Sequence, residues 1–330
     1  MLKKVRSHVF SALLGSTLLT LFLIVQLSWA LSSDAIHITS FGEVNIVPDT
    51  SSDFYSQFHT GFPAYVLGDS AWDSAMPFMK YVYSEAAFII NDDGSMTHTL
   101  YNPNDNAWIQ HLFDIGKIPI IQNWITNFDT VSEAGLRAYF RNLSAFLGQR
   151  KVIWLPCYEF NGANWGDRGN GQSWNLDPTI FNTKMALMRN ILDSEGITNI
   201  LLGVHMNLLL SDPVSVFTDF ISGMQKADIL GASLYRVSYS LDDYWARAQA
   251  IYDLIGTGKP WVFFEYGVSW ATTMTPAFVD ASYQKLNSHP WVKGFIWYID
   301  DASLTTGTMD AITSNAQAYE GGGGTPPPPE

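Results

Sequence analysis

Eight short apolar runs recur along this chain, and they restrict its fold more than any other feature. The runs are rich in Val, Ile, Leu and Phe, which is typical of strands covered on both faces, and stretches with helical periodicity separate several of them. Parallel strands joined by crossover helices have this pattern. We therefore predict an α/β fold, a closed (β/α)8 TIM barrel, with strands over 63–67, 86–90, 117–122, 151–157, 199–205, 228–235, 260–265 and 293–298.

Three of the intervening helices have recognisable ends. Asp177 is suited to cap a helix whose first turn contains Pro178. The apolar face of this helix is formed by Phe181, Met185, Met188 and Ile191. A second helix is expected between Ser132 and Gly148, and a third over 243–254.

Two of the predicted strands lead to a glutamate at or just beyond their end, and loop-forming residues follow it at once. The segment 154–162 contains Glu159, and the segment 261–267 contains Glu265. Active sites of TIM barrels lie at the C-terminal ends of the strands, so both carboxylates are expected at one rim, at the ends of the fourth and seventh strands. A retaining glycosidase requires a carboxylic acid and a carboxylate arranged in this way. A single glutamate at a strand end is more often structural, and two together favour catalysis.

The residues around these glutamates form a recognisable signature. Pro156, Asn161, Gly162 and Trp165 surround Glu159, the segment 264–267 reads Phe-Glu-Tyr-Gly, and 228–231 leads to Tyr235. These segments resemble the strand-four, strand-seven and strand-six motifs of glycoside hydrolase family 26 in clan A, a family dominated by endo-β-mannanases. The resemblance extends over residues 60 to 300.

This resemblance implies a role for each matching residue. Glu159 would be the general acid/base, and Glu265 would be the nucleophile. Tyr235 would hydrogen-bond the nucleophile, and Trp297 would form the floor of the subsite beside the scissile bond. No cofactor is implied.

Several tryptophans at or just beyond the predicted strand ends have flat rings suited to stack on sugars. These substrate-binding candidates are Trp124, Trp165, Trp174, Trp270 and Trp297. Core packing is the alternative for each of them, and it is the expectation for Trp154 and Trp261, which lie nearer strand starts. His205 ends the fifth predicted strand, and Asn207 follows it. His205 is a candidate for substrate binding, with a satisfied buried histidine as the alternative.

The charge of the chain excludes polyanionic partners. It carries 18 Lys and Arg against 31 Asp and Glu, a formal net charge of −13. Nucleic acid would be repelled, whereas a neutral polysaccharide would not. The single Cys157 lies in an apolar run and is expected to be an inert, packed thiol. The turn-like 91–94 lacks the ligand spacing of a calcium loop, so we expect no metal, and we expect a monomer.

The first 30 residues are typical of a secretory signal. Basic residues come first, and 7–33 contains no Asp, Glu, Lys or Arg. Ser28-Trp29-Ala30 fits a cleavage site. We expect a signal peptide over 1–30 and a secreted, extracellular protein. The same run is long enough to cross a bilayer, so an uncleaved membrane anchor is the alternative.

A barrel domain is expected over 31–320, and a linker over 321–330. In the final helix only 309–319 has suitable composition. The linker consists of glycines followed by prolines, which bury little apolar area. Such a tether commonly joins a catalytic module to a carbohydrate-binding or anchoring module, and a disordered tail is the alternative.

The favoured function is a retaining endo-β-glycanase that hydrolyses a β-1,4-linked polysaccharide, with mannan first and β-glucan or xylan next. The chain departs from the family pattern at Leu155 and Tyr158, where the family usually has arginine and histidine. These departures concern contacts to the substrate and leave the two glutamates unchanged. A noncatalytic carbohydrate-binding barrel at the cell surface is the alternative from another class, and a transglycosylase that uses the same pair is a third hypothesis.

Overall fold

The computed structural model describes the barrel part of the chain, within the unit Pro48–Glu330. The described residues are 59–64, 67, 70–100, 106–161, 176–208, 210, 213–236, 239–256, 258–268, 273–298 and 305–321. The predicted signal peptide over 1–30 and residues 322–330 of the predicted linker lie outside them. Among the helices in these ranges, none combines the length and apolar character that crossing a membrane requires.

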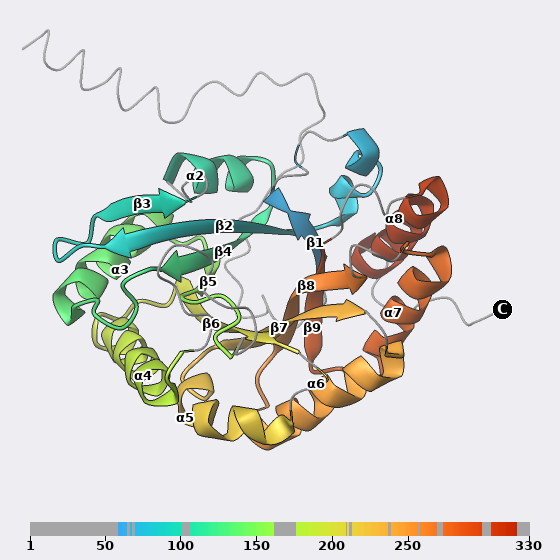
Figure 1. The fold of residues 1–330 in the computed structure, drawn as a ribbon. Helices are drawn as coiled ribbons and strands as arrows, with labels where there is room; N and C mark the ends of the chain where they lie inside the picture. Colours follow the sequence, from blue (N-terminus) through green and yellow to red (C-terminus); the bar gives the residue numbers. More distant parts are fainter. Residues whose placement is uncertain are drawn as a thin grey trace, which may run out of the picture. The chain divides into compact units, whose positions relative to one another are not determined.

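Eight parallel strands form a closed barrel, which confirms the predicted fold class (Figure 1). The strand order is β1-β9-β8-β7-β6-β5-β4-β2, and pairing of β1 with β2 closes the ring. The barrel strands are β1 His59–Pro63, β2 Tyr81–Ile90, β4 Ile118–Ile125, β5 Val152–Leu155, β6 Ile200–Asn207, β7 Ile229–Arg236, β8 Trp261–Val268 and β9 Val292–Trp297. A ninth strand, β3 Met96–Leu100, pairs antiparallel with β2 outside the ring.

Two strand predictions near the N-terminus were displaced. The first strand ends at Pro63, where 63–67 was expected, and the second begins at Tyr81 rather than at residue 86. Ser84 and Glu85 interrupt the apolar run, so the sequence pattern hid the first half of β2. The two polar side chains point to opposite faces of β2, because the residues are adjacent in the strand. The segment 91–94 is the turn between β2 and β3, as predicted.

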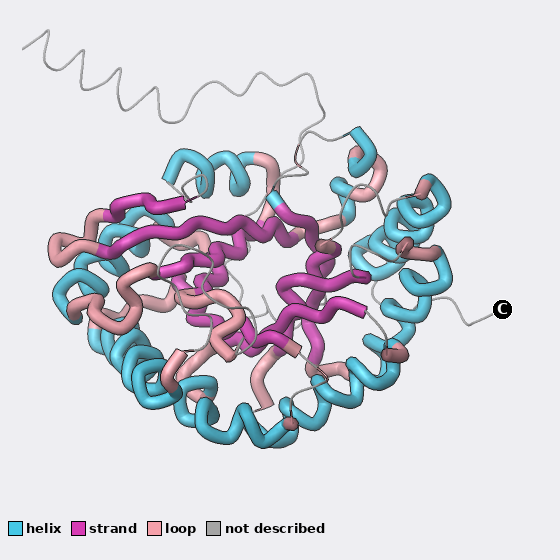
Figure 2. Tube along the Cα trace, viewed as in Figure 1, coloured by secondary structure: helices cyan, strands magenta, loops and turns pink. Residues whose placement is uncertain are grey.

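Helices surround the strands on the outside (Figure 2). They are α2 Asn106–Asp114, α3 Glu133–Leu147, α4 Pro178–Ser194, α5 Ile221–Met224, α6 Leu241–Ile255, α7 Pro276–Ser288 and α8 Thr306–Gly321, with 3-10 turns at Ser70–Trp72, Met76–Phe78 and Val214–Phe220. The Asp177 side chain accepts hydrogen bonds from two backbone amides at the start of α4, as its sequence position predicted. Ser132 caps α3 in the same way, and that helix ends at Gly148 with a φ of 60°.

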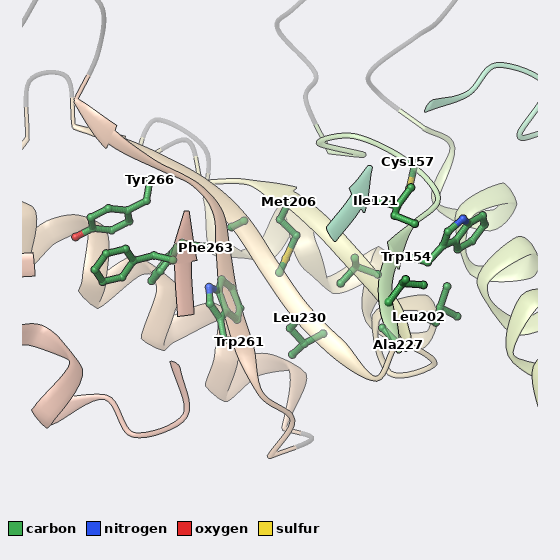
Figure 3. Close-up of a cluster of buried hydrophobic side chains, with 14 of the residues drawn as sticks. Ile121, Trp154, Cys157, Leu202, Met206, Ala227, Leu230, Trp261, Phe263 and Tyr266 are labelled. Atoms are coloured by element: carbon green, nitrogen blue, oxygen red, sulfur yellow. The ribbon is translucent and has the colours of Figure 1, made fainter. Parts of the chain in front are cut away.

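Alternate residues of each strand face different cores. Inside the ring lies a smaller apolar core that includes Tyr83, Leu155 and Phe264. Between strands and helices lies the larger core, which includes Trp154 and Trp261, both fully buried (Figure 3). A shift of one position along a strand therefore decides whether a side chain points into the barrel or toward the helices.

Candidate active site

Glu265 lies in the interior of β8 and is 1% exposed. A register shift in the β7–β8 ladder places Phe263 opposite Ala232 and Glu265 opposite Ser233, which leaves Phe264 as an extra residue. Such a bulge rotates the following side chains relative to a regular strand. Phe264 packs in the inner core, and the carboxylate directly after it also faces the inside of the barrel.

Three tyrosine hydroxyls donate hydrogen bonds to the Glu265 carboxylate. Tyr83 on β2 donates to Oε1 at 3.1 Å. Tyr158, in the bend after β5, donates to Oε2 at 2.9 Å, and Tyr235 on β7 donates to the same oxygen. The resemblance implied the Tyr235 contact, whereas no motif identified Tyr83 or Tyr158 as further donors to this carboxylate.

Burial and hydrogen bonding act in opposite directions on Glu265. Burial raises the pKa of this carboxyl, and hydrogen bonds from the three tyrosines act to lower it. Burial also raises the pKa of each tyrosine, and the negative charge of Glu265 raises it further. The tyrosines therefore remain neutral donors near neutral pH, and they stabilise the ionised form of the carboxylate.

Glu159 does not end its strand, which corrects the prediction. Strand β5 stops at Leu155, and Glu159 lies beyond it in the bend, 4% exposed. Its φ of 42° is in the left-handed region, and it is the one non-glycine residue with positive φ in the described ranges. That conformation costs roughly 1–2 kcal/mol for a residue with a Cβ atom. A strained backbone at this position requires support from the surrounding structure.

The support comes from β6. Asn161 and Asn207 exchange two hydrogen bonds, from Asn161 Nδ2 to the Asn207 carbonyl at 3.0 Å and from the Asn207 amide to Asn161 Oδ1 at 2.8 Å. The amide of Phe160 donates to the carbonyl of His205 at 3.3 Å. The Asn207 side chain then donates to Glu159 Oε2 at 2.7 Å. One asparagine thus fixes both the bend and the carboxylate that it carries.

The two glutamates belong to one site. Tyr158 directly precedes Glu159 in the chain, and its hydroxyl contacts Glu265. Burial is the main cause of the raised pKa of Tyr158 and of Tyr235, and the charges of Glu159 and Glu265 raise it further. The two carboxylates therefore lie near these two rings. The barrel therefore brings together two acidic residues that are far apart in the sequence.

His205 is fully buried, which contradicts its predicted role in substrate binding. Its Nδ1 lies 2.9 Å from Gln122 Oε1, and its Nε2 lies 2.7 Å from Ser233 Oγ. Burial lowers the pKa of His205 to about 3, so the ring is neutral. The ring packs edge-on against Tyr158 at 4.9 Å between centroids. His205 therefore supports a tyrosine that holds Glu265, and it has no free face for a sugar.

Trp297 points away from the barrel interior, so its predicted role as the floor of a subsite is wrong. It is fully buried in the outer core, with its ring centroid 5.4 Å from that of Tyr266. The next residue, Tyr298, points inward instead, 6.3 Å from Tyr83 and 6.1 Å from Tyr235 between ring centroids. The alternation of β9 explains this exchange, because side chains one residue apart lie on opposite faces.

Trp124 lies beside the site with 4% of its surface exposed, and its ring is 5.1 Å from that of Tyr158. Its contact with a sugar stays a prediction. The other tryptophan candidates, Trp165, Trp174 and Trp270, lie outside the described residues. Within the described ranges, no group of three or more His, Cys, Asp or Glu side chains is arranged to hold a metal ion.

Comparison by sequence gives no relative, since no family model and no curated protein matches the chain. Comparison of structures finds proteins of similar fold. A catalytic domain of an endo-β-1,4-mannanase of glycoside hydrolase family 26 from Bacillus sp. JAMB-750 aligns with a TM-score of 0.55 over 81% of this chain and 88% of that chain, at 12% identity. The chain has the fold of the family 26 glycoside hydrolases.

Two further family 26 mannanases align in the same way. The enzyme from Bacteroides ovatus has a TM-score of 0.54 and 12% identity, over 81% of this chain and 91% of that chain. A modular endo-β-1,4-mannanase from Cellulomonas fimi has a TM-score of 0.54 and 16% identity, over 82% and 72%. An engineered protein also aligns, with a TM-score of 0.51. At such identities the likeness concerns the fold, and the function has to be argued from the site.

Proposed function

We propose that this protein is a secreted, retaining endo-β-glycanase that acts on β-1,4-linked polysaccharide, with mannan as the first candidate substrate. The observation that carries the proposal is the hydrogen bond from Tyr158 to Glu265, because it joins the bend that bears Glu159 to the carboxylate on β8. The family 26 structures that share this fold are described as mannanases, and this supports the choice of sugar.

The chemistry follows from the two environments. Glu265 attacks the anomeric carbon and forms a glycosyl ester, while Glu159 gives its proton to the departing glycosidic oxygen. Glu159 then removes a proton from water, which attacks the same carbon and releases Glu265 as a carboxylate. The donors on Glu265 favour the charged form that attacks and leaves, and Asn207 fixes the direction in which Glu159 points. Retention requires the two carboxyl groups to be about 5–5.5 Å apart.

The occupants of the site also bear on specificity. Tyr158, which stands where family 26 usually has a histidine, brings a neutral phenol against the carboxylate. β-Glucan and xylan are therefore the next candidates after mannan, since a change beside the nucleophile alters contacts to the sugar bound there.

The test compares Glu265→Ala with wild type in a reducing-sugar assay on mannan, glucan and xylan. Glu133→Gln is a matched control, because Glu133 is a surface glutamate at the start of α3. We expect Glu265→Ala to lose turnover, Glu133→Gln to keep it, and azide to rescue Glu265→Ala by attacking in place of the lost carboxylate. Full activity of the alanine variant would exclude the proposed nucleophile.

The same panel separates the alternatives. A carbohydrate-binding barrel would be retarded in an affinity gel that contains the polysaccharide without releasing reducing ends. A transglycosylase would give longer products in the presence of an acceptor sugar. NMR of the first products formed distinguishes retention from inversion at the anomeric carbon. N-terminal sequencing of protein recovered from the medium tests the predicted cleavage after residue 30, and retention in the membrane fraction would indicate the anchor instead.

A further inference from the structure

A third carboxyl group, Glu85, lies next to the proposed nucleophile. Glu85 follows Tyr83 by two positions on β2, so both side chains lie on the inner face of that strand. Its ladder partner on β4 is Gln122, whose side chain contacts His205 inside the barrel. The residue is partly buried, and its Oε1 atom has almost no contact with solvent.

The Glu85 carboxyl lies close enough to the Glu265 carboxyl to act on it as a hydrogen-bond partner, and this contact acts to lower the pKa of Glu265. An ionised carboxylate has only acceptor atoms, so two carboxyl groups form a hydrogen bond only when one of them carries a proton. A charge on the Glu85 carboxyl would raise the pKa of Tyr83 and of Tyr158, which indicates that the carboxyl lies close to both rings. The contact is therefore part of the same cluster that holds Glu265.

The surroundings decide which of the two carries the proton. Glu265 already accepts three tyrosine hydroxyls, and each of these bonds favours its charged form. Loss of the proton from Glu85 as well would leave two charges side by side in a site of low polarity, which is unfavourable. The titratable groups that face this pair, or the rings that hold it, come from five parts of the barrel: Tyr83 on β2, Tyr158 and Glu159 after β5, His205 on β6, Tyr235 on β7 and Tyr298 directly after β9.

We propose that Glu85 is a positioning residue that keeps a proton at neutral pH and donates it in a hydrogen bond to Glu265, so that the two carboxyl groups titrate as one unit. The role of Glu265 as a nucleophile rests on the proposed function, whereas the sharing of a proton between Glu85 and Glu265 does not depend on it. The unit passes from two protons to one and then to none as the pH rises. The form with one proton is the form that attacks, and Glu85 keeps that proton while Glu265 forms and loses its bond to the sugar.

The pH dependence of activity follows from this arrangement. Glu85→Ala removes a donor from a buried carboxylate, so Glu265 becomes harder to ionise, and the acidic limb of kcat/KM moves up by about one pH unit. Glu85→Gln replaces the proton by an amide that also donates, so its acidic limb stays near that of wild type. A residue that only filled space would give no such difference between the two variants, and Glu133→Gln serves as the unchanged control.

The decisive experiment does not need turnover. The side-chain carboxyl carbons of the intact protein, labelled with 13C at the glutamate side chain, are titrated by NMR in wild type, Glu85→Gln and Glu265→Gln. Glu85→Gln assigns the Glu85 resonance. We expect Glu85 in wild type to lose its proton well above the usual range of glutamate, and in Glu265→Gln to lose it at lower pH, because the neighbouring charge is gone.

Titration of Glu85 in its ordinary range in wild type, with no response to Glu265→Gln, would overturn the proposal. A shared proton in a protein that cleaves none of the polysaccharides would leave this inference intact and remove the hydrolase. Circular dichroism establishes that each variant is folded, and if Glu85→Ala does not fold, the two glutamine variants still decide the question.

Discussion

Removal of the Tyr158 hydroxyl tests whether the three tyrosines keep Glu265 ionised. Tyr158→Phe deletes one hydrogen bond of 2.9 Å to a buried carboxylate and keeps the ring that packs on His205. A hydrogen bond to a charged group contributes about 1.5–3 kcal/mol. Since one pKa unit corresponds to about 1.4 kcal/mol, the loss is expected to raise the pKa of Glu265 by roughly one to two units.

The sign of the effect on activity is fixed by the direction of that shift. A nucleophile has to be ionised, so a raised pKa moves the acidic limb of kcat/KM to higher pH by the same roughly one to two units. Activity should fall steeply in acid and recover partly toward alkaline pH. The assay is kcat/KM against pH on a polysaccharide that wild type cleaves.

Tyr139→Phe is the matched control for this experiment. Tyr139 is a buried tyrosine, and its hydroxyl accepts a hydrogen bond from Trp154 Nε1 in the outer core. Its removal costs stability at a distance from Glu265 and should leave the pH profile unchanged. An identical acidic limb in folded Tyr158→Phe and in wild type would refute the reasoning, because the hydroxyl would then contribute nothing to the ionisation of Glu265.

Three more predictions concern stability and the remaining contacts of the site. Glu265→Gln should raise the melting temperature at neutral pH and lose this advantage below a pH of about 4. A buried carboxyl with a raised pKa contributes its full stability to the folded state below its unfolded pKa, and this contribution is lost as the pH rises. Equal melting temperatures of the variant and wild type at neutral pH in calorimetry would contradict this. Asn207→Ala should lower kcat on polysaccharide by roughly 10- to 100-fold and spare aryl glycosides, whose leaving groups need no acid from Glu159, whereas equal losses on both would exclude that role. Trp297→Leu should cost about 3 kcal/mol of unfolding free energy in urea titrations, while Tyr298→Phe should change kcat or KM with little loss of stability, and the reverse pattern would show that the two residues face the other way.

The eight barrel strands can be predicted from the sequence because the apolar pattern of each depends on burial. Strands covered on both faces read as continuous apolar runs, and this holds for most of β4 to β9 whatever their exact ends. The pattern fails where polar residues enter a strand. Ser84 and Glu85 interrupt the apolar run of β2, so the strand was predicted to begin after them. Glu85, the third carboxyl group of the site, was therefore overlooked.

The catalytic candidates were found by a different signal, and its limits are local. Motifs pointed to Glu159, Glu265 and Tyr235, which the structure brings together. The face of the strand to which a side chain points depends on the strand register, and an irregularity of a single residue changes that register. Trp297 was chosen where the inward residue is Tyr298, and strict alternation from Phe264 would have turned Glu265 outward had β8 contained no bulge.

The buried, neutral ring of His205 makes the stability of the barrel depend on pH in the acidic range. This uncharged imidazole contacts the side chains of Gln122 and Ser233 inside the barrel and packs edge-on against Tyr158. Its pKa is about 3 in the folded state and about 6.5 in an unfolded chain, so the stability it contributes is complete above 6.5 and drains away as the pH falls toward 3. Acid would thus lower the stability of the barrel by protonating a buried imidazole. This effect is separate from the titration of the carboxyl groups in the site.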